Sequence, residues 1–140
     1  MSFKVTFIDD GLGTLITAWD EMTEEDHIES VRQHLLRDTE ILKKVRFNIS
    51  DYVNSEGVAV SSEAVNKISE MCQRASKINN DIVIAIVAKA DHIYGMSRMW
   101  EMLSEETGWE TMVFRDLDIA KNWIRKRVKE KFGLEGLTFK

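Results

Sequence analysis

Proline is absent from the 140-residue chain, where an average usage of about 5% would place roughly seven. Its absence excludes proline-rich linkers, polyproline recognition segments and cis-proline turns. Cysteine is scarce too, because Cys72 is the only one in the sequence. A disulfide within the chain is therefore excluded, and a lone thiol is typical of a protein from a reducing compartment.

Long apolar runs are also missing. The longest spans residues 82–88, far short of the ~20 residues that a bilayer requires. The first ten residues have neither the apolar core of a secretory signal nor the arginine-rich character of a transit peptide. We therefore expect a soluble, cytoplasmic protein without a transmembrane segment.

Common catalytic signatures are missing as well. The chain has no glycine-rich phosphate loop ending in Gly-Lys-Ser/Thr, no His-Glu-x-x-His, no Cys-x-x-Cys and no Gly-x-Ser-x-Gly. His27 lies two residues from Glu25 and from Glu29, a spacing that puts these side chains on different helix faces rather than around one metal ion. We therefore expect no enzyme activity, no cofactor and no metal site.

Charge is unevenly distributed along the chain. The formal net charge is −5 and the isoelectric point is near 5.3, which disfavours nucleic acid as a partner. Residues 121–140 nevertheless carry seven Lys or Arg against two Glu. Because cations near the end of a helix complement its dipole, we favour a solvated helix face there over binding to an acidic membrane surface.

Hydrophobic periodicity and capping residues predict the order of the elements. A hairpin of residues 3–8 and 15–19 comes first, then a helix over 23–38, a strand over 43–50, a long and mobile loop over 51–60, a helix over 61–80, a strand over 82–88, a helix over 92–106, a strand over 109–114 and a helix over 116–133. Strands thus alternate with helices after the hairpin, which is typical of a mainly parallel sheet.

The predicted fold class is α/β. We expect a single domain over residues 1–132, with a mixed, mainly parallel sheet of about five strands, an N-terminal β-hairpin and four helices. Residues 133–140 form a C-terminal tail, whose Leu137 and Phe139 either dock on the domain or remain free. His34 and Cys72 lie on or beside apolar helix stripes, so both are predicted to pack in the core.

One strand has a regular polar row. Arg46, Asn48 and Ser50 alternate with apolar residues, which predicts that one face of the sheet is partly open or filled with water. Ligands of open α/β sheets bind beyond the carboxyl ends of the strands. Polar side chains predicted at those ends form a candidate ligand rim, namely Asp51, Tyr52, Asp91, His92, Tyr94 and Arg115.

The helix predicted over 92–106 is apolar on almost every side. Ile93, Met96, Trp100 and Leu103 share one stripe, whereas other methionines project away from it. Its second face is therefore covered either by another part of the chain, by a partner or by an apolar ligand. The candidate interface residues are Met99 and Met102 on this helix and Trp123 on the last helix.

The element order, together with AIVAKADHIYGMSRMWEML (85–103) and GWETMVFRDLDIAKNWI (108–124), resembles the SpoIIAA-like branch of the STAS superfamily. The resemblance implies a bacterial, non-catalytic domain. Relatives include anti-sigma-factor antagonists that are switched by phosphorylation of a serine at a helix start, and the fold also looks like that of lipid-transfer domains. Ser61 and Ser62 stand at such a helix start as candidate phosphoacceptors, although an N-cap is the favoured role.

Three functions remain open at this point. The leading expectation is a binding or regulatory module that acts through protein–protein contacts, either with a partner or with its own copy as a homodimer. The alternative is a carrier of a small apolar ligand or lipid. An acid–base or hydrolytic site using Asp91 and His92 is the least favoured, because no nucleophile is placed beside them.

Overall fold

The computed structural model describes residues 2–58 and 60–140. Five strands, five α-helices and three shorter helical turns follow one another along the chain. They are β1 (Phe3–Ile8), η1 (Asp9–Gly11), β2 (Gly13–Met22), α1 (Glu24–Val31), η2 (Arg32–Leu36), α2 (Thr39–Lys44), β3 (Phe47–Val58), α3 (Ser62–Ile78), β4 (Val83–Val87), α4 (Asp91–Ser104), η3 (Glu105–Thr107), β5 (Glu110–Phe114) and α5 (Leu117–Phe132).

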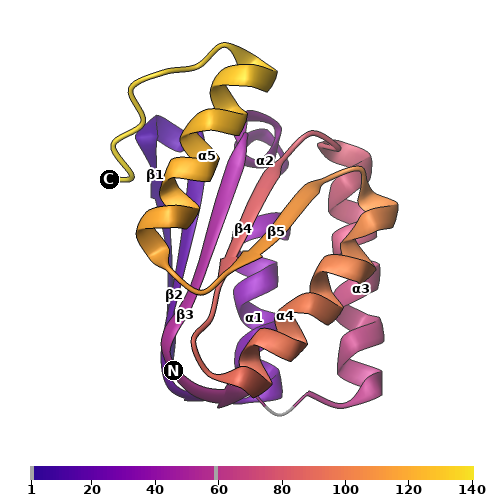
Figure 1. Ribbon diagram of the computed structural model, residues 1–140. Coiled ribbons are helices and arrows are strands. Elements are labelled where there is room, and N and C mark those ends of the chain that lie inside the picture. Colours follow the sequence, from indigo (N-terminus) through magenta and orange to yellow (C-terminus); the bar gives the residue numbers. More distant parts are fainter. Residues whose placement is uncertain (1, 59) are drawn as a thin grey trace.

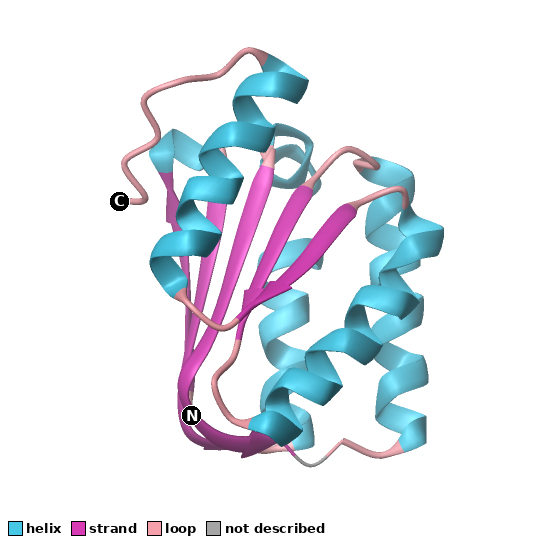
Figure 2. Cartoon of the chain, viewed as in Figure 1, coloured by secondary structure: helices cyan, strands magenta, loops and turns pink. Residues whose placement is uncertain are grey.

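The five strands form one sheet in the order β1-β2-β3-β4-β5. Strands β1 and β2 pair antiparallel, and every other neighbouring pair is parallel. Figures 1 and 2 show α1, α3 and α4 on one side of this sheet, with α5 and the C-terminal segment on the other. The mixed, mainly parallel α/β sheet with an N-terminal hairpin is therefore confirmed.

Two separate cores result from this layering. The larger core lies between the sheet and the layer of α1, α3 and α4, and the smaller one lies under α5 and the C-terminal segment. Every residue of β4 is buried, because alternate side chains enter opposite cores. On β3 the same alternation sends Phe47 and Ile49 toward α5, whereas Tyr52 belongs to the larger core.

The capping residues explain where several helices begin and end. Thr23 and Asp26 form a capping box at the start of α1, and Asp116 accepts a hydrogen bond from the Ile119 amide at the start of α5. Helix α5 ends at Gly133, whose φ of 68° is the left-handed conformation that favours glycine. The predicted boundaries of this last helix are confirmed.

The loop predicted over 51–60 is a strand as far as Val58, and residue 59 lies outside the described residues. Residues 51–58 continue β3, because β2 also extends to Met22 and provides partners for them as far as Val58. Two register irregularities, after Thr17 and after Asp20, accommodate the extra length. Because these irregularities interrupt the pairing, residues 51–58 do not show the strict alternation that is typical of a strand.

A fifth α-helix, α2, was also missed, and the strand predicted from residue 43 begins only at Phe47. Asp38 does not simply end the preceding helix, because its carboxylate accepts hydrogen bonds from the amides of Glu40 and Ile41. It therefore starts α2 as an N-cap. Between α1 and α2, residues 32–36 form a π-helical turn rather than more α-helix.

The segment after α5 packs on the sheet. Leu137 and Phe139 are buried in the smaller core, and the Phe139 ring meets Phe47 edge-on. The Asp9 carboxylate holds this segment by accepting hydrogen bonds from the amides of Thr138 and Phe139. Of the two alternatives for the tail, the structure shows docking.

Candidate ligand-binding cavity

A cavity of about 70 Å³ lies inside the larger core, between the sheet and the layer of α1, η2, α3 and α4. Apolar side chains from all of these layers form much of its wall, among them Ile16, Ile68, Ile84, Ile86, Trp100 and Trp109. The polar residues that line it are His27, Ser30, His34, Asn48, Ser50, Tyr52 and Cys72. A mainly apolar hollow with a few converging polar groups is the usual form of a small-molecule site.

The polar row of β3 faces this cavity. Asn48 donates through Nδ2 to the Thr14 hydroxyl at 2.7 Å, and the Ser50 hydroxyl donates to Asn48 Oδ1 at 2.8 Å. The Ser50 side chain also hydrogen-bonds Tyr52, although burial is stronger and raises the pKa of that phenol. These groups satisfy one another, so the row is stable away from bulk water.

This arrangement refines the sequence-based interpretation of the polar row. The alternation predicted a partly open or water-filled face, but helices cover this face and Asn48 and Ser50 are buried beside the cavity. Arg46 does not belong to the row, because it precedes β3 and its guanidinium donates to the Lys43 and Val45 carbonyls.

His27 is the most unusual group in the wall. The residue is only 4% exposed, and its ring stacks on Trp100 at 5.2 Å and on Tyr52 at 6.0 Å, measured between ring centroids. The Nδ1 atom is buried without a hydrogen-bond partner. Burial lowers the pKa of His27 to about 4, so the imidazole is neutral at pH 7.

His34 and Cys72 mark the mouth of the cavity, because both keep some exposure whereas most of the other wall residues are buried. His34 belongs to the π-helical turn η2, a rare conformation that is frequent at functional sites. Burial and the neighbouring His27 lower the pKa of His34 to about 3. Burial also raises the pKa of the Cys72 thiol to about 12.

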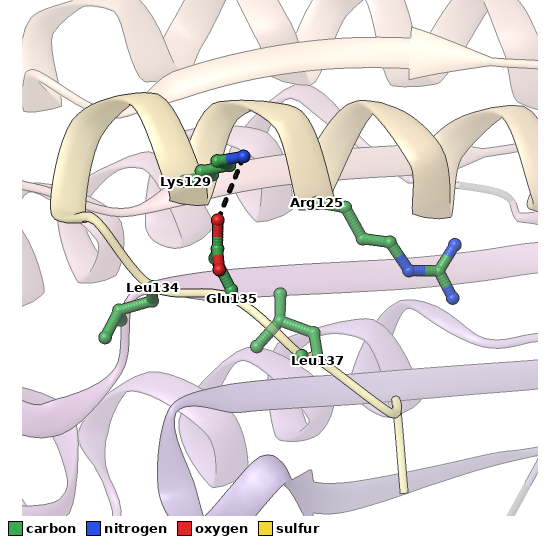
Figure 3. Close-up of a pocket in the computed structure, with 6 residues that line it drawn as sticks. Arg125, Lys129, Leu134, Glu135 and Leu137 are labelled. Carbon is green, nitrogen blue, oxygen red and sulfur yellow. Dashed lines mark ion pairs between the residues drawn. The ribbon is translucent and has the colours of Figure 1, made fainter.

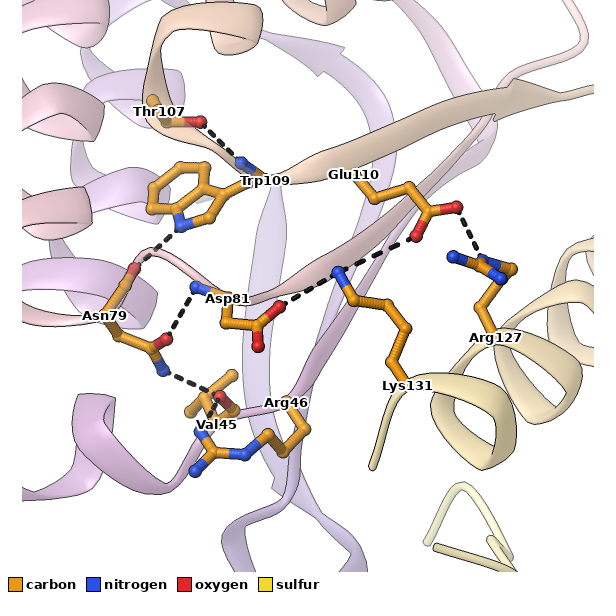
Figure 4. A network of polar contacts seen from close by, with 9 residues as sticks. All are labelled: Val45, Arg46, Asn79, Asp81, Thr107, Trp109, Glu110, Arg127 and Lys131. Carbon is orange, nitrogen blue, oxygen red and sulfur yellow. Dashed lines mark hydrogen bonds and ion pairs between the residues drawn. The ribbon is translucent and has the colours of Figure 1, made fainter. Parts of the chain in front are cut away.

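A polar network holds Trp109 in the wall (Figure 4). Its indole Nε1 donates to the Asn79 carbonyl at 2.8 Å, and the Asn79 amide in turn donates to the Val45 carbonyl. On the far side of β4, Lys131 lies 2.9 Å from Asp81. Because its N–H group is already paired, Trp109 offers the cavity only apolar surface.

Four of the six residues of the predicted ligand rim lie at the surface near the start of α4 and the end of β5, and none of them lines this cavity or the groove between α5 and the C-terminal segment. Asp91 and Arg115 form an ion pair at 3.0 Å, the Arg115 guanidinium lies 4.3 Å from the centre of the Tyr94 ring, and His92 lies against Gly57. Asp91, Arg115 and Tyr94 are thus paired with one another at the surface, whereas His92 contacts a different part of the chain.

The two remaining rim residues lie elsewhere, because the strand does not end where the sequence suggested. Tyr52 is inside β3 and lines the buried cavity instead. Asp51 is also within β3, and its carboxylate accepts a hydrogen bond from the Val53 amide. The placement of both at a strand end was wrong.

Ser61 is the N-cap of α3. Its hydroxyl accepts a hydrogen bond from the Ala64 amide, and its own amide donates to Glu24. Ser62 is the first residue of the helix and is exposed. The N-cap role is confirmed, whereas phosphorylation of either serine stays a prediction.

The candidate interface residues are spread over two sides of the molecule. Met99 on α4 is half-buried, and the Met102 side chain lies outside the part of the chain that the structure describes. Trp123 on α5 contacts Phe114 at 5.3 Å between ring centroids. The structure therefore does not bring these three residues together in one described patch.

A second hollow, of about 260 Å³, lies at the surface between α5 and the C-terminal segment (Figure 3). Lys129 and Glu135 pair across it at 2.9 Å, and the Arg125 guanidinium lies over the Phe139 ring. Each charged side chain of this groove thus has a partner within the protein. Other cations of α5 are paired as well, since Arg127 bridges Glu110 and Glu130.

Sequence reasoning missed His27 as part of a site. It was interpreted only as part of an acidic helix start, because its acidic neighbours lie on other faces. The signal that could have found it is the spacing of His27, Ser30 and His34, which puts these polar side chains on one helix face. That they meet the polar row of β3 depends on tertiary packing.

The fold is that of SpoIIAA-like proteins. A crystal structure described as an uncharacterized protein from the DUF3478 family with a SpoIIAA-like fold, from Shewanella loihica, matches this chain with a TM-score of 0.51. The match covers 87% of this chain and 91% of that one at 16% sequence identity. No protein-family model and no curated protein sequence matches the chain. The likeness therefore establishes the fold.

Two further properties concern the described residues. Within them, no helix is both long and apolar enough to cross a membrane. The same part of the chain has no group of three or more His, Cys, Asp or Glu side chains arranged to hold a metal ion.

Proposed function

We propose that this protein is a non-catalytic binding domain that holds a small, uncharged, mainly apolar molecule in the cavity between the sheet and the α1, α3 and α4 layer. The observation that supports this most is the cavity itself, because protein interiors are otherwise packed to the density of organic crystals. Unfilled space beside converging polar groups has a cost in stability that a binding site explains.

The titratable groups of the wall favour binding over catalysis. A nucleophilic cysteine needs a lowered pKa, whereas burial raises that of Cys72 to about 12. A general base needs a pKa near the working pH, whereas the buried His27 has a pKa of about 4. The polar groups of this cavity are therefore suited to hydrogen bonding and not to proton transfer at neutral pH.

Size separates the small ligand from a lipid. An engineered cavity of about 150 Å³ binds benzene, and this one is about 70 Å³. It therefore suits a molecule with few non-hydrogen atoms, and a long acyl chain would require the helices to separate. Of the two kinds of apolar cargo expected from the sequence, the cavity favours the small one.

The proposal is tested by analysing the molecules that purified protein releases on denaturation. Three proteins are compared by mass spectrometry: the unmodified chain, Cys72→Met, which fills the mouth of the cavity, and Glu70→Met, which places the same side chain on the exposed side of α3. We expect one compound to be enriched in the unmodified protein and in Glu70→Met, and depleted in Cys72→Met. Identical released molecules from all three would contradict the proposal.

Protein–protein contact is a second candidate function, favoured by exposed apolar side chains on β5 and α5. Met112 on β5 is 43% exposed and Ile119 on α5 is 59% exposed. Large apolar side chains exposed on neighbouring elements are a feature of interaction surfaces. If they mediate self-association, the double variant Met112→Glu with Ile119→Glu will lower the mass measured by light scattering; an unchanged mass would count against it.

A further inference from the structure

The two outer strands of the sheet, β1 and β5, differ in how they are protected from pairing with another chain (Figure 1). An outer strand has one row of backbone N–H and C=O groups that no neighbouring strand satisfies, and lysine or proline residues commonly keep such a row from pairing. Strand β1 carries the exposed Lys4. Strand β5 has neither lysine nor proline, and its one charged residue, Glu110, is paired with Arg127 of α5.

The hydrogen bonds between β4 and β5 show which backbone groups of β5 point outward. The Glu110 amide donates to the carbonyl just before β4 at 3.1 Å, and the Phe114 carbonyl accepts a bond from the amide just after β4 at 2.9 Å. In a parallel pair these bonds are evenly spaced, so that alternate residues bond to the same neighbour. The amides and carbonyls of Thr111 and Val113 therefore point away from β4.

The side chains of β5 leave its surface accessible. Four of the five residues keep some exposure, and only Val113 is buried. Met112 is 43% exposed, and it shares the α5 side of the strand with Phe114, whose ring contacts Trp123. Strand addition to a sheet uses main-chain bonds for affinity and alternate side chains for specificity, and β5 offers both.

We infer that β5 is the contact surface for a second copy of this chain, with the two β5 strands antiparallel about a two-fold axis at Met112. The inference rests on protein–protein contact, the second candidate function, and is independent of the cavity. In this arrangement Thr111 of each copy lies opposite Val113 of the other, and the two residues exchange both of their hydrogen bonds. The two Met112 side chains lie next to each other on the α5 side.

The pattern of β5 fits its own copy. The two residues with outward backbone groups lie on either side of Met112, so a two-fold axis there gives each of these groups a partner. The same axis places an exposed apolar side chain against an identical one. Like charges do not face each other, because Glu110 lies opposite Phe114 of the other copy.

The contact is small, since β5 has five residues. A standard interface buries about 1,600 Å², so pairing through this strand is expected to be weak and reversible. Sedimentation velocity should therefore show a monomer at about 1 μM and a growing share of dimer toward about 1 mM.

A lysine at the axis tests the surface. Met112→Lys gives β5 an exposed lysine like that of β1, and two such lysines would meet in the dimer. It should weaken association about tenfold or more, because like charges brought together cost several kcal/mol. Ile78→Lys makes the matched change at an exposed apolar residue of α3 and should leave association unchanged. Equal effects of the two variants would contradict the inference.

Amide–water exchange measured by NMR tests the backbone pairing itself. In the unmodified protein the Thr111 and Val113 amides should exchange severalfold more slowly in a concentrated sample than in a dilute one, whereas the Glu110 amide, already bonded beside β4, should not change. The same dilution series of Met112→Lys should show little change at any of the three.

The outcomes separate this inference from the function on which it rests. Association without slower exchange at Thr111 and Val113 would overturn the pairing of β5 and leave protein–protein contact standing. A monomer at every concentration would contradict both, and neither result affects the proposal for the cavity.

Discussion

The two faces of strand β3 differ in how they are packed. Phe47 and Ile49 on the α5 face are completely buried among Val, Ile and Ala side chains. Asn48 and Ser50, which alternate with them, line a cavity together with His27, whose Nδ1 is buried without a hydrogen-bond partner. One face of the strand thus contributes a closely packed core. The other face borders a cavity and a buried histidine nitrogen without a partner, and both of these lower stability.

The largest expected effect on stability comes from truncating a side chain on the α5 face of β3. Phe47→Ala should lower the free energy of unfolding by about 3–5 kcal/mol, because it leaves a hole in a dry core. Tyr52→Phe on the other face removes only a hydroxyl and should cost about 1 kcal/mol. Chemical denaturation measures both, and equal losses would remove the distinction between the faces.

The polar row gives the next largest effect. Asn48→Ala should cost about 3 kcal/mol, near the top of the range for a lost buried hydrogen-bond partner, because both Thr14 and Ser50 lose their bond to this side chain. Asn54→Ala, an exposed site on the same strand, is the matched control. A similar loss for the two variants in urea denaturation would show that the row contributes no special stability.

Acid should first destabilise the core between the sheet and the α1, α3 and α4 layer, because His27 lies there. Because the pKa of His27 is about 4 when folded and near 6.5 when unfolded, protons bind the unfolded chain more strongly between these values. Stability therefore falls as the pH falls, by about 2 kcal/mol between pH 7 and pH 5 from this residue. His34, with a pKa of about 3 when folded, changes stability in the same direction.

The control for this prediction is His27→Phe, which cannot be protonated. Denaturation curves at pH 7 and pH 5 should show a smaller pH dependence in the variant than in the unmodified protein, provided that the variant folds. An unchanged dependence would mean that the neutral state of His27 contributes nothing to the acid sensitivity.

The smallest effect is expected at the surface rim. Arg115→Ala breaks the exposed ion pair with Asp91 and the contact with Tyr94, yet should change stability by no more than about 1 kcal/mol. It should also leave unchanged the amount of the compound that the purified protein releases on denaturation. A clear loss of that compound would move the site from the cavity to the rim.

Sequence patterns predicted those parts of the fold that depend on local periodicity. The apolar β4 and the helix between Asp116 and Gly133 were found, because burial on both faces and capping leave direct signatures. The polar row of β3 predicted a partly open or water-filled face, whereas the structure shows a face covered by helices, with a small cavity beside Asn48 and Ser50. Helix α2 and the far half of β3 were missed, since a second N-cap and paired strand irregularities carry no periodic signal.

The candidate site was less accessible to prediction than the fold. Its wall combines side chains from β2, β3, β4, α1, η2, α3 and α4, so that no short motif contains it. The polar face of α1 and the polar row of β3 are each visible in the sequence, but their meeting is decided by packing. The sequence pointed instead to charged residues predicted at the strand ends, and in the structure Asp91 and Arg115 of that set form an ion pair with each other.

Xenon binding tests the central claim most directly, namely that the core between the sheet and the α1, α3 and α4 layer encloses unfilled space, whereas the described core beneath α5 is closely packed. Xenon enters small apolar cavities and shifts the NMR signals of nearby methyl groups. Under xenon pressure we predict shifts at Ile16, Ile68, Ile84 and Ile86 in the cavity wall, and none at Ile8, Ile49 and Ile124 in the core beneath α5. Shifts confined to the second group, or equal in both groups, would contradict the account.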